Sequence, residues 1–406
     1  MRPLRVAVIG LRGIPSNYGG VEVACERLYS ILASKGHSVT AYCRPEYAPP
    51  RGPAFHNGIR LLAAPAIRWK SFDTLSYSTW SVLAAALKGN YDVIHLHTLA
   101  PGLLSGVCRL LQIPTVVTVH GLDWKRAKWG GMGSAVLQAA ERSIVKHASA
   151  VIVVSENLQS YFYNKYQRTT CYIPNGVDTR LTSLTDESVL AQFALHPQGY
   201  VAYIGRLVPE KRVEDLIRAF LRTETTQHLA IVGEAGYTDS YEQSLRRLAS
   251  DDSRIVFTGL QRGDALEVLF RNATACVFPS ALEGLPLALL ECLAYGTPAI
   301  ATDIAPHQEL LANIPGHDLF FQVGDTSGLT ELLHRVIGSP QRYKTIAVEA
   351  QAKVVVRYNW EDIAQATEAV YEEATMPRSK KRHSATMYGS CSPRDGDNIG
   401  VVRHCP

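Results

Sequence analysis

Short apolar runs alternate with amphipathic stretches along most of the chain. An apolar run of four to eight residues predicts a strand buried on both faces, as in a parallel sheet. In the first half these runs are Leu4–Leu11, His37–Tyr42, Val93–Leu96, Thr115–His120 and Ala150–Val154. Stretches with apolar residues at helical spacing lie between them, including 21–32 and Leu75–Leu87. Strands alternating with helices predict an α/β protein.

The second half repeats the pattern. Its predicted strands are Val201–Ile204, Leu229–Val232, Arg254–Phe257, Ala273–Phe278 and Pro298–Ala301. Apolar residues between Val213 and Leu221 recur at the spacing of a helix packed on a sheet. Turn residues near Pro174 interrupt the alternation. We therefore expect two Rossmann-like lobes, 1–173 and 174–355, then an amphipathic helix at 356–375 and a disordered basic tail at 376–406.

Composition limits the functional classes. The chain has 406 residues and is 46% hydrophobic, enough for two cores. A net charge of +4 implies no extended nucleic-acid surface. The sequence has no secretory leader and no apolar run of the ~18 residues that a membrane span needs. Its eight cysteines lack a Cys-x-x-Cys pair and are expected to be reduced, in a cytoplasmic protein.

The stretch from Val277 to Asp303 carries the strongest chemical signal. It predicts a strand, a loop and a helix that opens at Gly284-Leu285-Pro286 and closes near Gly296. Glu283 precedes the first turn and Glu291 lies inside the helix, roughly 12 Å away along the axis. The free N–H groups of the first turn suit an anion. Two carboxylates around an anion site fit a nucleotide sugar; the alternative is an ordinary helix with solvated glutamates.

The glycines after the first strand are spaced too widely for the dinucleotide fingerprint G-x-G-x-x-G. This weakens a nicotinamide interpretation. Gly19 and Gly20 at a helix start would instead let the backbone approach a ligand closely. The alternative is a loop that needs positive φ.

Three further side chains follow predicted strands, where ligands of open α/β sheets bind. His120 ends one strand of the first lobe; the alternative is a capped loop histidine. Arg206 and Lys211 follow the first strand of the second lobe and could meet a diphosphate; the alternative is a surface salt-bridge pair. His95 and His97 share one face of a strand, but no third ligand has a suitable spacing, so no metal site is assigned.

The segments EGLPLALLE and AYGTPAIATD resemble the signature of the large fourth family of retaining glycosyltransferases, which have the two-lobed B fold. The resemblance implies a cleft between the lobes and a C-terminal helix that crosses back to the first lobe. It places Glu283 and His120 on the transferred sugar and Glu291 on the ribose. The remaining implied contacts are the diphosphate with Gly284, Leu285, Pro286 and Leu287, the leaving nucleotide with Arg206 and Lys211, the donor phosphate with Gly19 and Gly20, and the acceptor with Glu22.

No Asp-x-Asp metal motif is evident in either lobe, so we expect a metal-independent transferase without a cofactor. GIPSNYGGVE and HGLDWKRAKWG are similar to a subgroup that includes bacterial rhamnosyltransferases and other surface-polysaccharide enzymes. A lipid-linked saccharide acceptor would then be used at the inner face of the membrane. Trp124 and Trp129, with Lys125, Arg126 and Lys128, suit a membrane surface or a loop with packed tryptophans.

Two other classes of enzyme remain as alternatives. One is a sugar-nucleotide epimerase on the same scaffold, which the combination of EGLPLALLE with GRLVPEK disfavours. The other is an oxidoreductase or a non-catalytic nucleotide-binding module, which the glycine spacing disfavours. The fold alone does not separate these classes, because function depends on the site.

Overall fold

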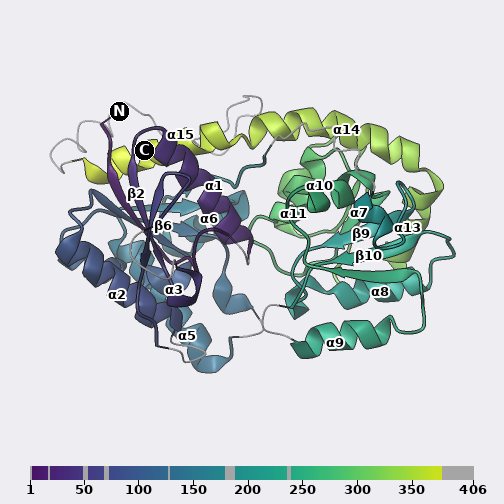
Figure 1. Cartoon of the computed structure of the whole chain (residues 1–406), viewed down its shortest axis with the longest axis horizontal. Coiled ribbons are helices and arrows are strands. Elements are labelled where there is room, and N and C mark those ends of the chain that lie inside the picture. The colour runs from purple at the N-terminus through teal and green to yellow at the C-terminus, as the bar shows by residue number, and fades with distance from the viewer. Residues whose placement is uncertain are drawn as a thin grey trace. The chain divides into compact units, whose positions relative to one another are not determined.

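The structure, a computed structural model, describes residues 2–16, 19–48, 54–67, 73–126, 129–178, 188–235 and 239–376. The chain forms two compact units (Figure 1). Unit 1 combines Met1–Gly176 with Tyr358–Pro406, and unit 2 is Val177–Arg357. The chain thus passes from one unit to the other after residue 176 and returns after residue 357. The sequence analysis had placed these two boundaries after residues 173 and 355. Of the predicted tail, residues 377–406 lie outside the described residues.

Unit 1 contains an eight-stranded sheet of order β3-β4-β2-β1-β5-β6-β7-β8. Its strands are parallel except for β3, which is antiparallel to β4 at one edge. Their bounds are β1 (Arg5–Ile9), β2 (Ser38–Cys43), β3 (Ala54–His56), β4 (Ile59–Ala63), β5 (Val93–His97), β6 (Thr115–Val119), β7 (Ala150–Val153) and β8 (Cys171–Tyr172). The five predicted strands are present, whereas the short strands β3, β4 and β8 were not predicted.

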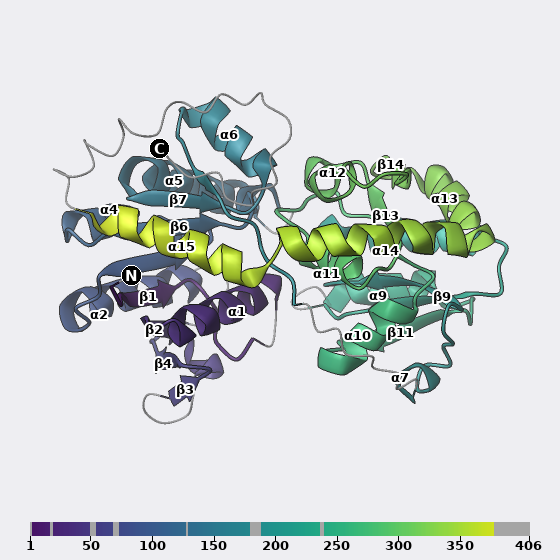
Figure 2. The same ribbon diagram turned by 90° about the horizontal axis from the view of Figure 1, so that it is seen from above.

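Helices cover this sheet. They are α1 (Gly20–Ser34), α2 (Asp73–Lys88), α3 (Leu99–Gly102), α4 (Ser105–Leu110), α5 (Gly131–His147), α6 (Glu156–Tyr166) and α15 (Trp360–Thr375). The C-terminal helix α15 packs beside α1 on one face of the sheet (Figure 2). Two buried polar contacts join it to the rest of the unit: the Glu368 carboxylate with His37 at 2.8 Å, and the Tyr371 hydroxyl with His95 at 2.7 Å.

Unit 2 contains six parallel strands of order β11-β10-β9-β12-β13-β14. The strands are β9 (Tyr200–Ile204), β10 (His228–Val232), β11 (Ile255–Gly259), β12 (Ala275–Phe278), β13 (Ala299–Thr302) and β14 (Phe320–Phe321). The helices are α7 (Ser188–Ala191), α8 (Val213–Leu221), α9 (Asp239–Leu248), α10 (Gly263–Asn272), α11 (Leu287–Ala294), α12 (Ala305–Leu311), α13 (Thr326–Gly338) and α14 (Pro340–Arg357). All five predicted strands are present, with ends shifted by at most two residues.

The structure confirms the predicted apolar face of α8 for four of its five residues. Val213, Leu216, Ile217 and Phe220 are fully buried in the core of unit 2, against strands β9 and β10. Leu221 is the exception, because it is the last residue of the helix and is 38% exposed. This packing fixes the start of α8, and with it the segment that carries Arg206 and Lys211.

The strand order reverses beside the first strand of each sheet. In unit 1, β1 lies between β2 and β5, and in unit 2, β9 lies between β10 and β12. The loops that leave the two flanking strands diverge at such a point, which opens a crevice where ligands of α/β proteins bind. His97 is the last residue of β5, and His120 follows β6. The segments after β9 and β12 contain Lys211 and Glu283.

Two expectations drawn from composition can be compared with the structure. No described helix is long and apolar enough to cross a membrane. Five cysteines are free and buried: Cys25, Cys43, Cys108, Cys276 and Cys292. Cys171 is disulfide-bonded, so the prediction that all eight cysteines are reduced is wrong for this residue.

A tight backbone crossing joins the ends of β9 and β10. Gly233 has φ +145°, and a Cβ there would lie 1.9 Å from the carbonyl oxygen of Gly205. Gly233 also donates its N–H to the Gly259 carbonyl at 2.9 Å. A side chain would therefore require both a rare backbone conformation and a shift of β9.

We predict that Gly233→Ala lowers the free energy of unfolding of unit 2 by more than about 1 kcal/mol. The matched control is Gly338→Ala, because a Cβ at Gly338 meets nothing within 4 Å. The control should be unchanged or slightly more stable, since alanine favours the end of helix α13. Urea denaturation of both variants tests this. If the two variants have the same free energy of unfolding, the close contact between Gly233 and Gly205 does not exclude a side chain at position 233.

Candidate active site

A buried ion pair joins two segments that follow strands of unit 2. Strand β9 leads through Gly205 and Arg206 to a short 3-10 helix, Pro209–Lys211, and strand β12 leads to the loop that contains Glu283. The Lys211 ammonium donates to Oε1 of Glu283, with side chains 18% and 11% exposed. The N–H of Ala281 also donates to the Glu210 carbonyl at 2.9 Å. The structure therefore brings together two of the predicted catalytic residues at the reversal point of the sheet.

The charge state of Glu283 follows from this pair. Burial alone would raise the pKa of the Glu283 carboxyl, but the Lys211 ammonium holds that pKa below its ordinary value. Glu283 is thus an ionised carboxylate within the protein and not a solvated helix charge. Lys211 is largely buried, which argues against a surface salt-bridge role for it, whereas Arg206 is exposed.

Helix α11 begins one residue later than predicted. Pro286 has an extended backbone with ψ 101° and is the N-cap, so the helix opens at Leu287. No side chain caps this helix end. Gly284, Leu287 and Ala288 are partly exposed, while Leu285 and Pro286 are buried. A ligand at this end would therefore meet backbone N–H groups and the Gly284 backbone, and not the Leu285 side chain.

Glu291 lies one turn further along α11. The helix ends at Tyr295 and Gly296, and Gly296 has φ +63° as the sequence pattern requires. Burial, and next the nearby Asp178 carboxylate, raise the pKa of Glu291 to about 7. Glu291 is partly buried, which does not fit the alternative of a fully solvated helix glutamate. Hydrogen-bond donors from a ligand would stabilise the ionised form of Glu291 and lower its pKa.

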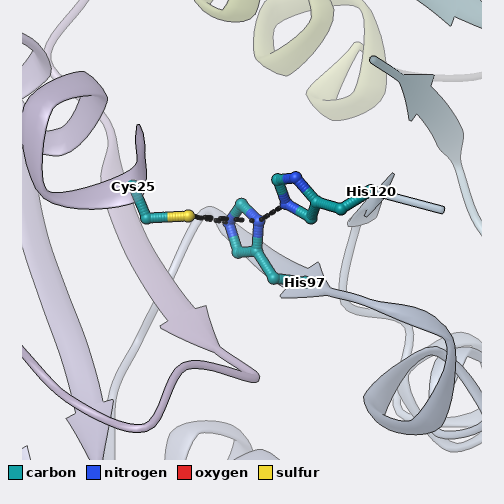
Figure 3. A group of neighbouring side chains, drawn as sticks. All are labelled: Cys25, His97 and His120. Atoms are coloured by element: carbon teal, nitrogen blue, oxygen red, sulfur yellow. Dashed lines mark hydrogen bonds between the residues drawn. The ribbon is translucent and has the colours of Figure 1, made fainter. Parts of the chain in front are cut away.

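His120 follows β6 in unit 1 and is bound by another histidine. Its Nε2 lies 3.0 Å from Nδ1 of His97, and the two rings are stacked (Figure 3). Burial, and next the Arg126 guanidinium, lower the pKa of His120 to about 4. The ring is therefore neutral near pH 7 and can act as a hydrogen-bond donor or acceptor. The alternative of a loop histidine that only caps backbone does not fit this contact.

The histidine pair of β5 is placed differently from the expectation. His95 is enclosed by Tyr29, Tyr371 and Thr118, at 2.7–2.8 Å from its ring nitrogens. His97 instead faces His120 and the thiol of Cys25, whose sulfur is 3.5 Å from Nδ1 of His97. The sequence analysis found no third ligand at a suitable spacing, and the structure places Cys25 and His120 beside His97. No spacing rule could reveal the group, because Cys25 lies 72 residues from His97.

The glycine pair at the start of α1 does not have positive φ. Gly19 is the N-cap with an extended backbone (φ −179°), and Gly20 is the first helical residue. The interpretation as a positive-φ loop is therefore wrong. A Cβ at Gly19 would lie 2.7 Å from Oε2 of Glu22, and the other carboxylate oxygen is 3.9 Å from Nε of Arg12. Asn17 and Tyr18 of the same loop lie outside the described residues.

The tryptophan-containing loop after β6 is partly anchored. The indole N–H of Trp124 donates to the Glu141 carboxylate at 2.9 Å, and the Lys165 ammonium lies 5.5 Å from the ring centroid. This supports the packed-loop alternative for Trp124. Lys128 lies outside the described residues.

Comparisons with known proteins identify the class of enzyme. Residues 18–181 match the family described as Glycosyltransferase Family 4, and residues 198–339 match the family described as Glycosyl transferases group 1. The chain is a glycosyltransferase. Alpha-maltose-1-phosphate synthase of Mycolicibacterium smegmatis is 26% identical to this glycosyltransferase over 307 residues, which cover 70% of this chain and 79% of that enzyme.

Solved structures confirm the two-lobed B fold of this glycosyltransferase. Sucrose-phosphate synthase from Thermosynechococcus elongatus matches with a TM-score of 0.78 at 23% identity, over 94% of this chain and 100% of that one. Anabaena HepE, solved with UDP and glucose, matches with a TM-score of 0.75 at 18% identity, over 91% and 99% of the two chains.

The raised pKa of Glu291 predicts a pH dependence of stability. A carboxyl group whose pKa rises from 4.5 to about 7 on folding stabilises the fold fully below pH 4.5 and loses this contribution as pH rises through about 7. Glu291→Gln cannot ionise, so its stability relative to the wild type should increase between pH 5 and pH 8. Urea denaturation at several pH values measures the difference. If the difference in free energy of unfolding between Glu291→Gln and the wild type is the same at every pH, the pKa of Glu291 is not raised on folding.

Proposed function

We propose that unit 2 binds a nucleotide-diphosphate sugar and that the protein transfers its sugar, with retention of configuration, to a saccharide acceptor. The buried Lys211–Glu283 pair carries this proposal, since it places a cation and an ionised carboxylate beside the uncapped start of α11. A diphosphate needs the cation and the helix end, and a sugar ring needs a hydrogen-bond acceptor for its hydroxyls.

The two ends of the nucleotide sugar would each contact one glutamate of the segment that contains α11. We propose that Glu283 accepts hydrogen bonds from the transferred sugar and Glu291 from the ribose hydroxyls. The backbone from Gly284 through Leu285 and Pro286 to Leu287 would follow the diphosphate. Two hydroxyl donors would favour ionised Glu291 and compensate for the burial and the Asp178 charge that raise its pKa.

Arg206 and Lys211 would stabilise the leaving nucleotide. Negative charge builds on the diphosphate as the glycosidic bond breaks through an oxocarbenium-like state. An ammonium group has three N–H donors, so the contact of Lys211 with Glu283 leaves donors for a phosphate oxygen. Glu283 also fixes the position of Lys211 before the donor arrives, and preorganised charge of this kind is commonly a large catalytic effect. We propose that these two cations take the role that a divalent ion has in other transferases.

Unit 1 would supply the acceptor side. We propose that the acceptor contacts the start of α1 near Gly20 and Glu22, that Gly19 and Gly20 lie near the donor phosphate, and that neutral His120 contacts the transferred sugar. The family resemblance supports these roles. So does the position of Gly19, where a Cβ would lie 2.7 Å from the Glu22 carboxylate and that side chain would have to move.

The biological setting is proposed from the resemblance alone. GIPSNYGGVE and HGLDWKRAKWG favour a lipid-linked saccharide acceptor in bacterial exopolysaccharide, capsule or O-antigen synthesis, with rhamnose as one donor sugar to test. The protein would then work in the cytoplasm at the inner face of the membrane. Trp124 would not be the membrane contact, because its indole is held by Glu141.

Donor binding can be tested by thermal denaturation with UDP, GDP, dTDP and ADP sugars and with NAD. A ligand at about 100 times its dissociation constant adds about 2.7 kcal/mol, which raises Tm by a few degrees. We expect one nucleotide sugar to shift the wild type and the control Glu349→Ala, an exposed glutamate of α14, but not Glu291→Ala. A shift by NAD alone would refute the proposal.

The leaving-group assignment predicts a kinetic effect of Arg206→Ala. Loss of one preorganised charge contact should lower kcat about 10²–10³-fold at saturating donor. Arg342→Ala is the matched control, because Arg342 is an exposed arginine of the same unit. The kcat of both variants is measured as the rate of sugar transfer, with the donor that shifts Tm in the denaturation experiment. If Arg206→Ala keeps the wild-type kcat, Arg206 does not stabilise the leaving group.

A further inference from the structure

Three side chains from separate parts of unit 1 point toward one another: Cys25 from α1, His97 from the end of β5 and His120 just after β6 (Figure 3). Each offers one ligand atom within 4.8 Å of the other two. Cys25 and His97 are buried, and His120 is partly buried. One sulfur and two imidazole nitrogens form a ligand set that suits zinc.

The distances are close to those of a tetrahedral zinc site. Bond lengths of about 2.3 Å to sulfur and about 2.0–2.1 Å to nitrogen place the ligand atoms about 3.6 Å apart for S···N and about 3.4 Å apart for N···N. The sulfur of Cys25 is 3.5 Å from Nδ1 of His97, and that nitrogen is 3.0 Å from Nε2 of His120. Small rotations of the side chains would therefore admit the ion.

The surroundings of His97 support a ligand role. A histidine that binds a metal normally donates its other N–H to a fixed partner, which orients the ring. Nε2 of His97 is 2.6 Å from the hydroxyl of Tyr29, and that hydroxyl is 2.8 Å from Nδ1 of His95. If His97 donates to Tyr29 and Tyr29 donates to His95, Nδ1 of His97 carries a lone pair that faces Nε2 of His120. The Cys25 sulfur lies beside the same ring, 3.5 Å from Nδ1 and 3.8 Å from Nε2.

Space for a further ligand lies beside the three side chains. They line a cavity of about 30 Å³, together with Asn175 and residues of α15. This volume accommodates a water molecule. Three protein ligands and one open position are typical of a zinc site that can exchange its fourth ligand.

We propose that Cys25, His97 and His120 form a binding site for Zn²⁺ or a similar borderline-soft divalent cation. Binding replaces the thiol proton of Cys25, which is released to solvent, and it requires unprotonated Nδ1 on His97 and Nε2 on His120. The proton shared between these two nitrogens moves to Nδ1 of His120. No electron is transferred, because zinc is redox-inert.

The test uses Co²⁺ as a spectroscopic substitute for zinc, with the full chain kept without oxygen and without added reductant, so that the disulfide of Cys171 stays intact. One equivalent of Co²⁺ should give a thiolate-to-cobalt charge-transfer band, and excess Zn²⁺ should remove the band. Cys25→Ser should lower the affinity at least about tenfold and abolish the band. Cys108→Ser is the matched control, since Cys108 is a buried free cysteine of the same unit, and it should keep the band.

His97→Gln is a second variant that removes a nitrogen ligand and keeps the thiol. It should weaken Co²⁺ binding to a similar extent, with circular dichroism used to verify its fold. Absence of a saturable band in the wild type would overturn the proposal. So would a band that survives in folded Cys25→Ser, since the thiolate would then come from another cysteine.

One consequence rests on the proposed function of His120. An ion on Nε2 would withdraw this ring from the transferred sugar, so Zn²⁺ should inhibit transfer by the wild type and inhibit Cys25→Ser at least about tenfold more weakly. The cobalt spectrum needs no sugar substrate and decides the metal site by itself. Cobalt binding without inhibition by zinc would therefore contradict the role of His120 in transfer and not the metal site.

Discussion

Parallel strand pairing is the constraint on which the rest of this structure depends. Neighbouring strands of a parallel sheet run in one direction, so the segments that leave their carboxyl ends meet at one edge. Residues far apart in sequence thereby become neighbours, as with Lys211 after β9 and Glu283 after β12, which are 72 residues apart. In unit 1 the carboxyl ends of the strands bring together His97, the last residue of β5, and His120, which follows β6. The apolar cores serve to keep these edges fixed.

The two glutamates of the α11 segment show how position alone separates the behaviour of identical side chains. Both are shielded from water, which raises the pKa of a carboxyl group. Lys211 reverses this effect at Glu283 and keeps it ionised, whereas Asp178 adds to it at Glu291. Glu283 is therefore ionised and can accept hydrogen bonds. Glu291 ionises most readily when hydrogen-bond donors lie beside it. This difference is consistent with the roles proposed for them, Glu283 on the transferred sugar and Glu291 on the ribose.

A chain of buried polar contacts connects the C-terminal helix of unit 1 to His120. It runs from the hydroxyl of Tyr371 on α15 through His95, Tyr29 and His97 to His120, with each contact between 2.6 and 3.0 Å. Burial is the leading reason that the pKa values of all three histidines lie below the ordinary value, so the rings are neutral at pH 7. Tyr371 and Tyr29 both contact Nδ1 of His95, so this one nitrogen joins helix α15 to the contacts that lead to His120.

The sequence by itself determined the alternation of strands and helices, the two-lobed architecture and the segment around Glu283 and Glu291, because these depend on local apolar periodicity and on a continuous motif. It also placed Arg206, Lys211 and His120 after strands. Short edge strands such as β3 and β8 were missed, since two or three residues carry no detectable period. Only the tertiary structure decided that Lys211 pairs with Glu283, that Glu291 and Asp178 are neighbours, and that Cys25 joins His97 and His120. These contacts depend on how sheets and helices stack, and the spacing of residues along the chain does not encode that stacking.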